Sequence, residues 1–299
     1  EKNIPLEERP EIDRWILSEL QSLVKTVDDA YGDYEPTKAA RAISEYVQEN
    51  LSNWYVRLSR RRFWKGDYQK DKISAYQALY TCLLTVAKLS APIAPFFMDR
   101  IYKDLTNITK IDTFESVHLS GFPEYDASMV DQPLESRMQK AQQISSLVLS
   151  IRQKEKIKVR QPLRRIMIPV MNNNLRQEIE AVADLIKSEV NVKEIELLDD
   201  ASGILVKQVK PNFKVLGPKY GKEMKLIAQT VSGFGPEDIQ EIEQKGEISV
   251  EIENKTIILQ LQDVEITSQD IEGWLVASSG ALTVALDVTI TENLREEGI

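Results

Sequence analysis

The chain has 299 residues, of which 42% are hydrophobic and 28% are charged, as in soluble globular proteins of two or three domains. Its net charge of −9 excludes a uniformly basic nucleic-acid binder, so any anionic partner must be held by local patches. The single cysteine, Cys82, excludes an internal disulfide framework and a cysteine-rich zinc cluster. No apolar run approaches the roughly 18 residues of a membrane-spanning helix. Because the chain begins at Glu1, we expect it to belong to a longer protein.

The first half of the chain has the apolar periodicity of α-helices. Prolines fit the first turn of several of them, and the prolines at 92 and 95 predict a turn between two helices. Five antiparallel helices joined by modest loops predict an all-α bundle over residues 1–155. The helices are expected from Pro10 to Gly32, from Pro36 to Gly66, from Asp71 to Ala91, from Phe96 to Leu105, and from Pro133 through Ile151.

The second half changes character near Lys156 and predicts small α/β or α+β modules. We expect a junction module over 156–235 and a mostly β module over 236–299. The whole is therefore predicted to be multidomain, with a helical bundle followed by these modules. Strands are expected at 164–170, 192–198 and 204–209, helices at 175–189, 220–231 and 236–245, and hairpins at 248–261 and 274–289.

The segment Asn53–Lys65 combines five cationic side chains and four aromatic side chains with no acid. Helical spacing places Trp54 in the buried stripe, and Arg62 is expected to cover that stripe or to pair with a buried acid. Arginines on a helix usually form a solvated face, but the lack of acids here favours an anion-binding edge in which Arg60 rests on Trp64. The candidate RNA contacts are Arg57, Arg60, Arg61, Trp64 and Lys65.

Two further basic segments follow. Residues 152–165 carry seven cations against one acid, with Lys156, Lys158 and Arg160 as candidate contacts. Residues 207–225 carry six lysines against one acid, and their glycines allow close approach of a partner. Ordinary surface lysines on a capped loop explain this second segment equally well. Its candidate contacts are Phe213, Lys214, Lys219, Tyr220 and Lys222.

The sequence provides few catalytic candidates. A single histidine, His118, cannot form a histidine-rich metal site, and it lies far along the chain from Cys82. The chain has neither the glycine-lysine phosphate loop nor the glycine-rich dinucleotide turn. We therefore predict no catalytic residue, no metal site and no bound cofactor in this stretch.

Several motifs resemble the C-terminal part of isoleucyl-tRNA synthetases, with the likeness extending over nearly the whole chain. The earlier motifs are shared in outline with the valine and leucine enzymes of the same class I subgroup, and the segment Lys210–Lys225 is what points to isoleucine. The motifs are Asp13–Leu17, Asn53–Trp64, Ala91–Phe96, Ser116–Leu119, Ile157–Leu163, Lys210–Lys225 and Thr283–Asp287.

The resemblance implies an anticodon-binding helical domain followed by a C-terminal extension. The parent enzyme would be cytoplasmic and monomeric and would join isoleucine to its tRNA with ATP and magnesium, whereas its catalytic and editing motifs are absent from this sequence. Some bacterial relatives end in a four-cysteine zinc site, which one cysteine cannot build. This favours the branch shared by eukaryotes and some bacteria.

The leading hypothesis is therefore the tRNA-binding portion of an isoleucine–tRNA ligase, inactive by itself, with tRNA and the rest of the synthetase chain as partners and no membrane. One alternative is the equivalent part of a valine or leucine enzyme. Another is a helical protein–protein docking module that uses the acidic C-terminal surface. A complete standalone enzyme is disfavoured by the missing motifs.

Overall fold

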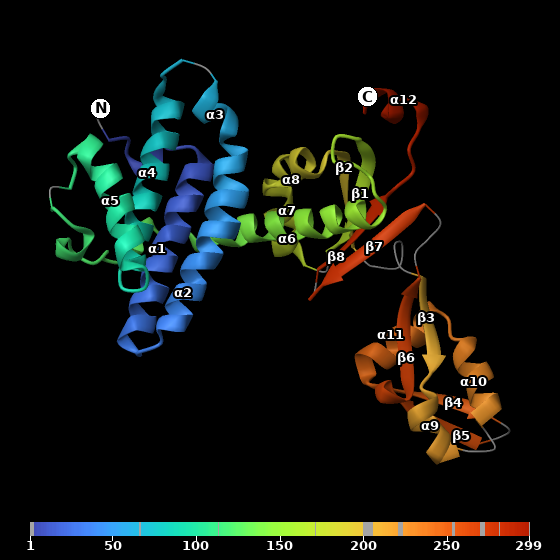
Figure 1. The fold of residues 1–299 in the computed structure, drawn as a ribbon. Coiled ribbons are helices and arrows are strands. Elements are labelled where there is room, and N and C mark those ends of the chain that lie inside the picture. Colours follow the sequence, from blue (N-terminus) through green and yellow to red (C-terminus); the bar gives the residue numbers. More distant parts are fainter. Residues whose placement is uncertain are drawn as a thin grey trace. The chain divides into compact units, whose positions relative to one another are not determined.

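The computed structural model divides into two compact units, Glu1–Met138 and Gln139–Ile299 (Figure 1). The predicted fold class is confirmed, because a helical bundle comes first and small modules of strands and helices follow. The structure describes residues 3–65, 67–112, 114–170, 172–199, 206–220, 224–252, 255–269, 273–280 and 282–298.

The first unit is built from long helices whose limits agree closely with the predicted ones. Prolines occupy the first turn of three of them, where a missing N–H costs no hydrogen bond, and Lys110 ends one helix in the left-handed region with φ 56°. The helices are α1 (Glu11–Gly32), α2 (Pro36–Glu45), α3 (Arg60–Trp64), α4 (Lys70–Ser90), α5 (Pro95–Thr109) and α6 (Gln132–Lys154), and the division between the units falls within α6.

A π-helical segment, Tyr46–Val56, joins α2 to the short helix α3 where the sequence predicts one regular α-helix. Its wider i→i+5 turns bury Tyr46, Leu51 and Tyr55 at steps of five and four residues. The segment still buries Trp54, as predicted. This local widening lets the chain place two neighbouring aromatic side chains, Trp54 and Tyr55, inside the bundle.

The core of the first unit is apolar with a few engaged polar groups. Trp15, Ile16 and Leu20 of α1 are fully buried. Cys82 is buried as predicted, and this burial raises the pKa of its thiol to about 12, so the thiol is unreactive at neutral pH. The Tyr46 hydroxyl donates to the carbonyl of Ile16 and lies 3.2 Å from the Cys82 sulfur.

One half-buried carboxyl of this unit has no cationic partner among the described residues. Glu19 of α1 accepts hydrogen bonds from the Trp15 indole at 3.1 Å and from the Asn50 amide at 3.3 Å. Burial, reinforced by the nearby charge of Glu135, raises the pKa of Glu19 from 4.5 to about 7. Glu135 itself accepts from Ser18 and Ser22.

The raised pKa of Glu19 predicts a pH dependence of stability. Between about pH 4.5 and 7 the folded chain holds a proton that the unfolded chain has lost, so the free energy of unfolding falls as pH rises through this range. Glu19→Gln carries no charge. Its amide oxygen can still accept from Trp15, and its amide nitrogen can donate to the Asn50 side-chain oxygen once the Asn50 amide is turned over. The variant is expected to raise stability at pH 8 by about 1–3 kcal/mol and to remove this pH dependence. Urea unfolding of both chains at pH 5 and pH 8 tests it, and equal pH profiles would contradict it.

The second unit contains a four-stranded sheet of order β2-β1-β8-β7. Strand β1 pairs in parallel with β2 and antiparallel with β8, so residues from 163 and from 287 meet in one sheet. The domain limits predicted at 155 and 235 stay predictions, but strand pairing runs across the second of them. The elements are β1 (Leu163–Pro169), α7 (Asn173–Ala181), α8 (Ala183–Val190), β2 (Val192–Leu198), β7 (Trp274–Ser279), β8 (Leu282–Asp287) and α12 (Glu292–Glu297).

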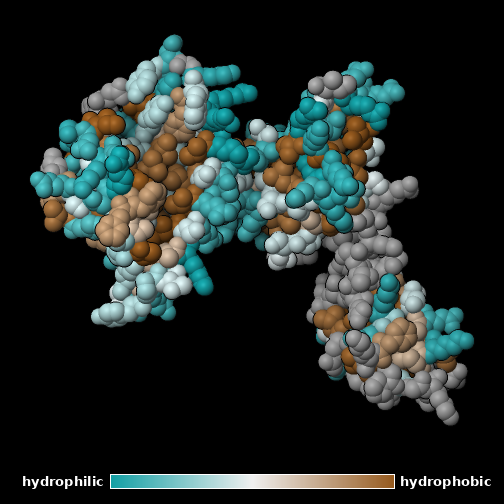
Figure 2. Space-filling view, viewed as in Figure 1, coloured by the Kyte–Doolittle hydropathy of each residue, from teal (hydrophilic) through white to brown (hydrophobic). Residues whose placement is uncertain are grey.

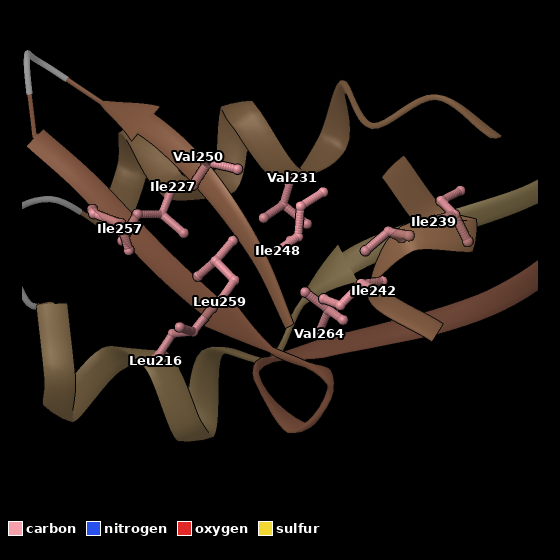
Figure 3. Packing of buried hydrophobic residues seen from close by; sticks show 11 residues of the cluster. Leu216, Ile227, Val231, Ile239, Ile242, Ile248, Val250, Ile257, Leu259 and Val264 are labelled. Atoms are coloured by element: carbon pink, nitrogen blue, oxygen red, sulfur yellow. The ribbon is translucent and has the colours of Figure 1, made fainter. Parts of the chain in front are cut away.

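The chain between β2 and β7 has an apolar core of its own (Figure 3). Its first and last strands pair antiparallel, with Val206 opposite Gln269, so its entry and exit lie side by side. Side chains such as Leu216, Ile227 and Leu259 point toward one another between helices and strands. The elements are β3 (Val206–Pro211), α9 (Phe213–Tyr220), α10 (Met224–Ser232), α11 (Pro236–Lys245), β4 (Glu247–Ile252), β5 (Lys255–Gln260) and β6 (Val264–Gln269).

The pattern of the sequence missed α9, β6 and α12, whereas the hairpin of β4 and β5 follows the prediction within one residue. Within the described residues, no helix combines the length and the apolar character needed to cross a membrane.

Candidate nucleic-acid interface

The short helix α3, which carries most of the predicted basic contacts, is bound through Arg62 to a buried carboxylate, Asp13 of α1. Asp13 is fully buried and receives both terminal nitrogens of Arg62, at 2.7 and 2.8 Å. The hydroxyls of Tyr55 and Ser74 complete its hydrogen bonds, at 2.8 and 2.5 Å. The prediction that Arg62 pairs with a buried acid is confirmed, and the structure identifies that acid as Asp13, which sequence reasoning left unnamed.

Arg62 also joins α3 to α4. Its Nε donates to both carboxylate oxygens of Asp71 at 3.0 Å. Burial lowers the pKa of this guanidinium, but its hydrogen bonds to Asp13 and Asp71 outweigh that effect, and the pKa is raised overall. Arg62 therefore stays charged and fixes the rotation of α3, with Phe63 turned into the core beside it.

Because Arg62 fixes α3 in this orientation, the predicted RNA contacts are exposed to solvent. Arg57, Arg60, Arg61 and Lys65 are exposed, and the ring of Trp64 is 72% exposed. The Arg60 guanidinium lies 5.8 Å from the centre of the Trp64 ring, so the predicted cation–π pair is confirmed. Arg57 donates from Nε to the Asn53 carbonyl at 2.6 Å.

Hydrophilic side chains gather over the α3 end of the first unit (Figure 2). In the part of the chain that the structure describes, no acid pairs with Arg61 or Lys65. Cations without an acidic partner can bind phosphate, and the exposed indole beside them can stack on an unpaired base. We call this surface, formed by Arg57, Arg60, Arg61, Trp64 and Lys65, the α3 edge. The RNA contacts themselves stay a prediction.

The three predicted contacts Lys156, Lys158 and Arg160, called the junction patch below, belong to the second unit. The backbone of their loop is held by hydrogen bonds. The buried Arg152 of α6 donates to the carbonyls of Gln161 and Asn191, both at 2.9 Å, and burial lowers the pKa of its guanidinium to about 10. The Asn191 amide donates back to the carbonyls of Val159 and Arg160. These bonds shape the loop that carries the junction patch.

The loop itself presents all three predicted cations to solvent. Lys156 has φ 57°, a left-handed conformation that ends α6, and its side chain is exposed. Lys158 and Arg160 are exposed as well, and no acid of the described residues pairs with any of the three. A rigid loop with three unpaired cations loses little conformational entropy when it binds phosphate.

Neutralising this patch is expected to weaken RNA binding without unfolding the chain. We choose Lys156→Asn, Lys158→Gln and Arg160→Gln together, because asparagine tolerates the left-handed backbone of position 156. Each lost phosphate contact should reduce the slope of log K against log salt by about 0.7–0.9. Binding titrations at several salt concentrations measure this slope.

A matched control removes the same charge elsewhere. Lys25, Arg100 and Lys245 are exposed cations that already pair with an acid one helical turn away. Their combined change to glutamine should leave the slope nearly unchanged. If the junction variant keeps both the wild-type slope and the wild-type melting temperature, its cations do not contact RNA.

The third predicted patch is described only in part. Phe213 at the start of α9 is 62% exposed, whereas Tyr220 at its end packs against the apolar core between β2 and β7. Tyr220 is therefore less accessible to a base than the sequence predicts. The side chains of Lys214 and Lys219, and the whole of Lys222, lie outside the described residues.

Sequence reasoning also missed two aromatic residues that follow the segment Asn53–Lys65. The rings of Tyr68 and Tyr76 lie beyond Gly66, where the predicted helix ends, and both are exposed. A tyrosine pair eight residues apart, with Lys65, Lys70 and Lys72 close in sequence, was the available signal.

Comparison with known proteins gives a family match that covers the helical unit and continues into the second unit. A family model described as the anticodon-binding domain of tRNA ligase matches residues 13–168, just over half of the chain, from Asp13 to Ile168 near the end of β1. The chain belongs to this family. The predicted resemblance to a class I tRNA ligase is confirmed at this level, and the match includes both the α3 edge and the junction patch.

Individual relatives agree with this assignment. The isoleucine–tRNA ligases of Bacteroides fragilis and Porphyromonas gingivalis are each 58% identical to the chain over 299 residues, which is 100% of the chain and 26% of each relative. That of Thermus thermophilus is 36% identical over 296 residues, which is 99% of the chain and 28% of the relative. The chain thus spans about a quarter of the length of the relatives it matches.

Proposed function

We propose that the chain is the tRNA-binding portion of an isoleucine–tRNA ligase and that it recognises the anticodon arm of isoleucine tRNA. Identity of 58% along its whole length to enzymes of that name is the observation that carries this proposal. The relatives reported above carry the isoleucine name, which favours this proposal over the alternatives, a valine or leucine enzyme. In the cell the partner besides tRNA would be the rest of the same ligase.

The residues divide the work of binding by chemistry. Arg60, Arg61 and Lys65 would hold phosphates of the tRNA, and Trp64 would stack on an unpaired base. The junction cations at 156, 158 and 160 would hold further phosphates. The overall charge of −9 repels RNA elsewhere, so binding would be confined to these patches.

The whole enzyme would attach isoleucine to tRNA with ATP and magnesium, through domains outside this stretch. We further propose a monomeric, cytoplasmic enzyme of the branch shared by eukaryotes and some bacteria.

Titration with two RNAs tests the proposal. The 299-residue chain is expected to bind an isoleucine tRNA transcript more tightly than the same transcript with an exchanged anticodon. It is also expected to show no isoleucine-dependent ATP–pyrophosphate exchange. Equal affinity for the two transcripts would contradict anticodon recognition, and robust exchange would contradict the assignment of the catalytic step to other domains.

A further inference from the structure

Two exposed aromatic rings, Tyr68 and Tyr76, lie next to α3 on the first unit and begin a row of aromatic contacts. Tyr68 is 62% exposed and Tyr76 is 42% exposed. Their ring centres lie 6.3 Å apart and their planes differ by 18°, which is a nearly parallel arrangement. Aromatic rings are usually buried in a core, so two nearly parallel rings that are both exposed at one place need a physical explanation.

The buried ring of Phe63 connects Tyr76 to Trp64, which is one of the predicted RNA contacts. Tyr76 lies edge-to-face against Phe63, with 5.3 Å between ring centres, and Phe63 lies edge-to-face against Trp64 at 6.2 Å. The hydroxyl of Tyr76 donates to the Phe63 carbonyl at 3.2 Å. Phe63 is buried, so Tyr76 and Trp64 are both held against a fixed support.

Each end of the row carries a cation. Arg60 lies 5.8 Å from the centre of the Trp64 ring, and the ammonium of Lys72 lies 6.0 Å from the centre of the Tyr68 ring. Of the two acids in this segment, Asp71 is paired with Arg62, and Asp67 lies in the loop beside Tyr68. Aromatic faces flanked by cations suit stacked bases and the phosphates that connect them.

We propose that Tyr68 and Tyr76 form a second base-stacking site, next to Trp64, for unpaired nucleotides of the bound RNA. This inference rests on the proposed function and extends it beyond the residues predicted from sequence. Stacking on tyrosine tolerates any base, so the site would add affinity for the unpaired loop and would leave the choice of tRNA to other contacts. Paired RNA would not use it, because the faces of its bases are covered.

Leucine substitutions separate stacking from packing. Tyr68→Leu keeps apolar bulk and removes the ring, and it is expected to weaken tRNA binding by about 5- to 100-fold. Tyr76→Phe keeps the ring and should bind within about twofold of wild type. The matched control is Tyr34→Leu, because Tyr34 is 92% exposed at the turn between α1 and α2, and its loss should change the affinity less than twofold.

Changes on the RNA side identify the partner of the ring. Abasic nucleotides are placed one at a time in the unpaired anticodon loop, which removes a base and keeps its phosphate. One position is expected to weaken binding to the wild-type chain and to have no further effect on Tyr68→Leu, because both changes remove the same contact. Melting temperatures of all variants should equal that of wild type within about 2 °C.

The outcomes distinguish this inference from the function on which it rests. If the wild-type chain does not bind the transcript, the proposed function and the inference fall together. If it binds and Tyr68→Leu binds equally well, the inference alone is overturned. Equal sensitivity of Tyr68→Leu and wild type to every abasic position would also overturn it.

Discussion

Replacing Asp13 by alanine is expected to lower the free energy of unfolding of the helical unit by about 3–5 kcal/mol. The change removes the bidentate partner of Arg62, which keeps only Asp71 as an acidic partner. It also leaves the Ser74 hydroxyl without its acceptor and the Tyr55 hydroxyl with only the Ala75 carbonyl, at 3.2 Å. Removing one partner of a buried ion pair costs more than the pair contributes, because a desolvated charge remains. Urea unfolding of the 299-residue chain, followed by near-ultraviolet circular dichroism, measures the loss.

A neighbouring arginine gives the control. Arg61 is exposed and has no acidic partner among the described residues, so Arg61→Ala should change the free energy of unfolding by less than about 0.5 kcal/mol. Asp13→Asn keeps an acceptor and loses the charge, and it should fall between the two. If Asp13→Ala unfolds at the same urea concentration as wild type, the buried ion pair does not hold α3 in place.

The second large effect separates the two tryptophans of the same helical segment. Trp54→Ala is expected to cost about 3–5 kcal/mol of stability, because Trp54 is buried and its loss opens a cavity. Trp64→Ala should cost less than about 1 kcal/mol of stability, since its ring is exposed. It should instead lose about 1–3 kcal/mol of tRNA binding if a base stacks on the indole.

The contact between Arg60 and Trp64 gives a second test of the role of Trp64. Arg60→Ala removes a phosphate contact and the cation that lies over the Trp64 ring. The binding losses of Arg60→Ala and Trp64→Ala should therefore be less than additive in the double variant. Should Trp64→Ala unfold the unit while the remaining folded protein binds tRNA normally, Trp64 is a structural residue and the α3 edge is a solvated face.

Local pattern predicted the helical unit well because its contacts are mostly between neighbouring helices. The apolar stripe through Trp54, the proline-initiated helices and the inward turn of Arg62 follow from spacing and residue type alone. The π-helical segment was not predictable in this way, since its wide turns depend on Tyr46 and Tyr55 finding partners on other helices.

Long-range pairing was the other feature beyond the reach of local pattern. Strand β1 pairs with β8, more than a hundred residues later in the chain, and β3 pairs with β6 across three helices and a hairpin. Such pairings are chosen by tertiary packing. The same reason applies to the site, because Asp13 and Tyr76 gain their roles only when α1, α3 and α4 come together.

The dependence of tRNA affinity on salt tests the central claim most directly. If the α3 edge and the junction patch hold RNA phosphates, a plot of log K against log salt for the 299-residue chain should fall with a slope of about −0.7 to −0.9 for each phosphate held. Several contacts predict a slope of about −3 or steeper. A nearly flat plot, with binding retained at high salt, would contradict this account and would favour an apolar docking module instead.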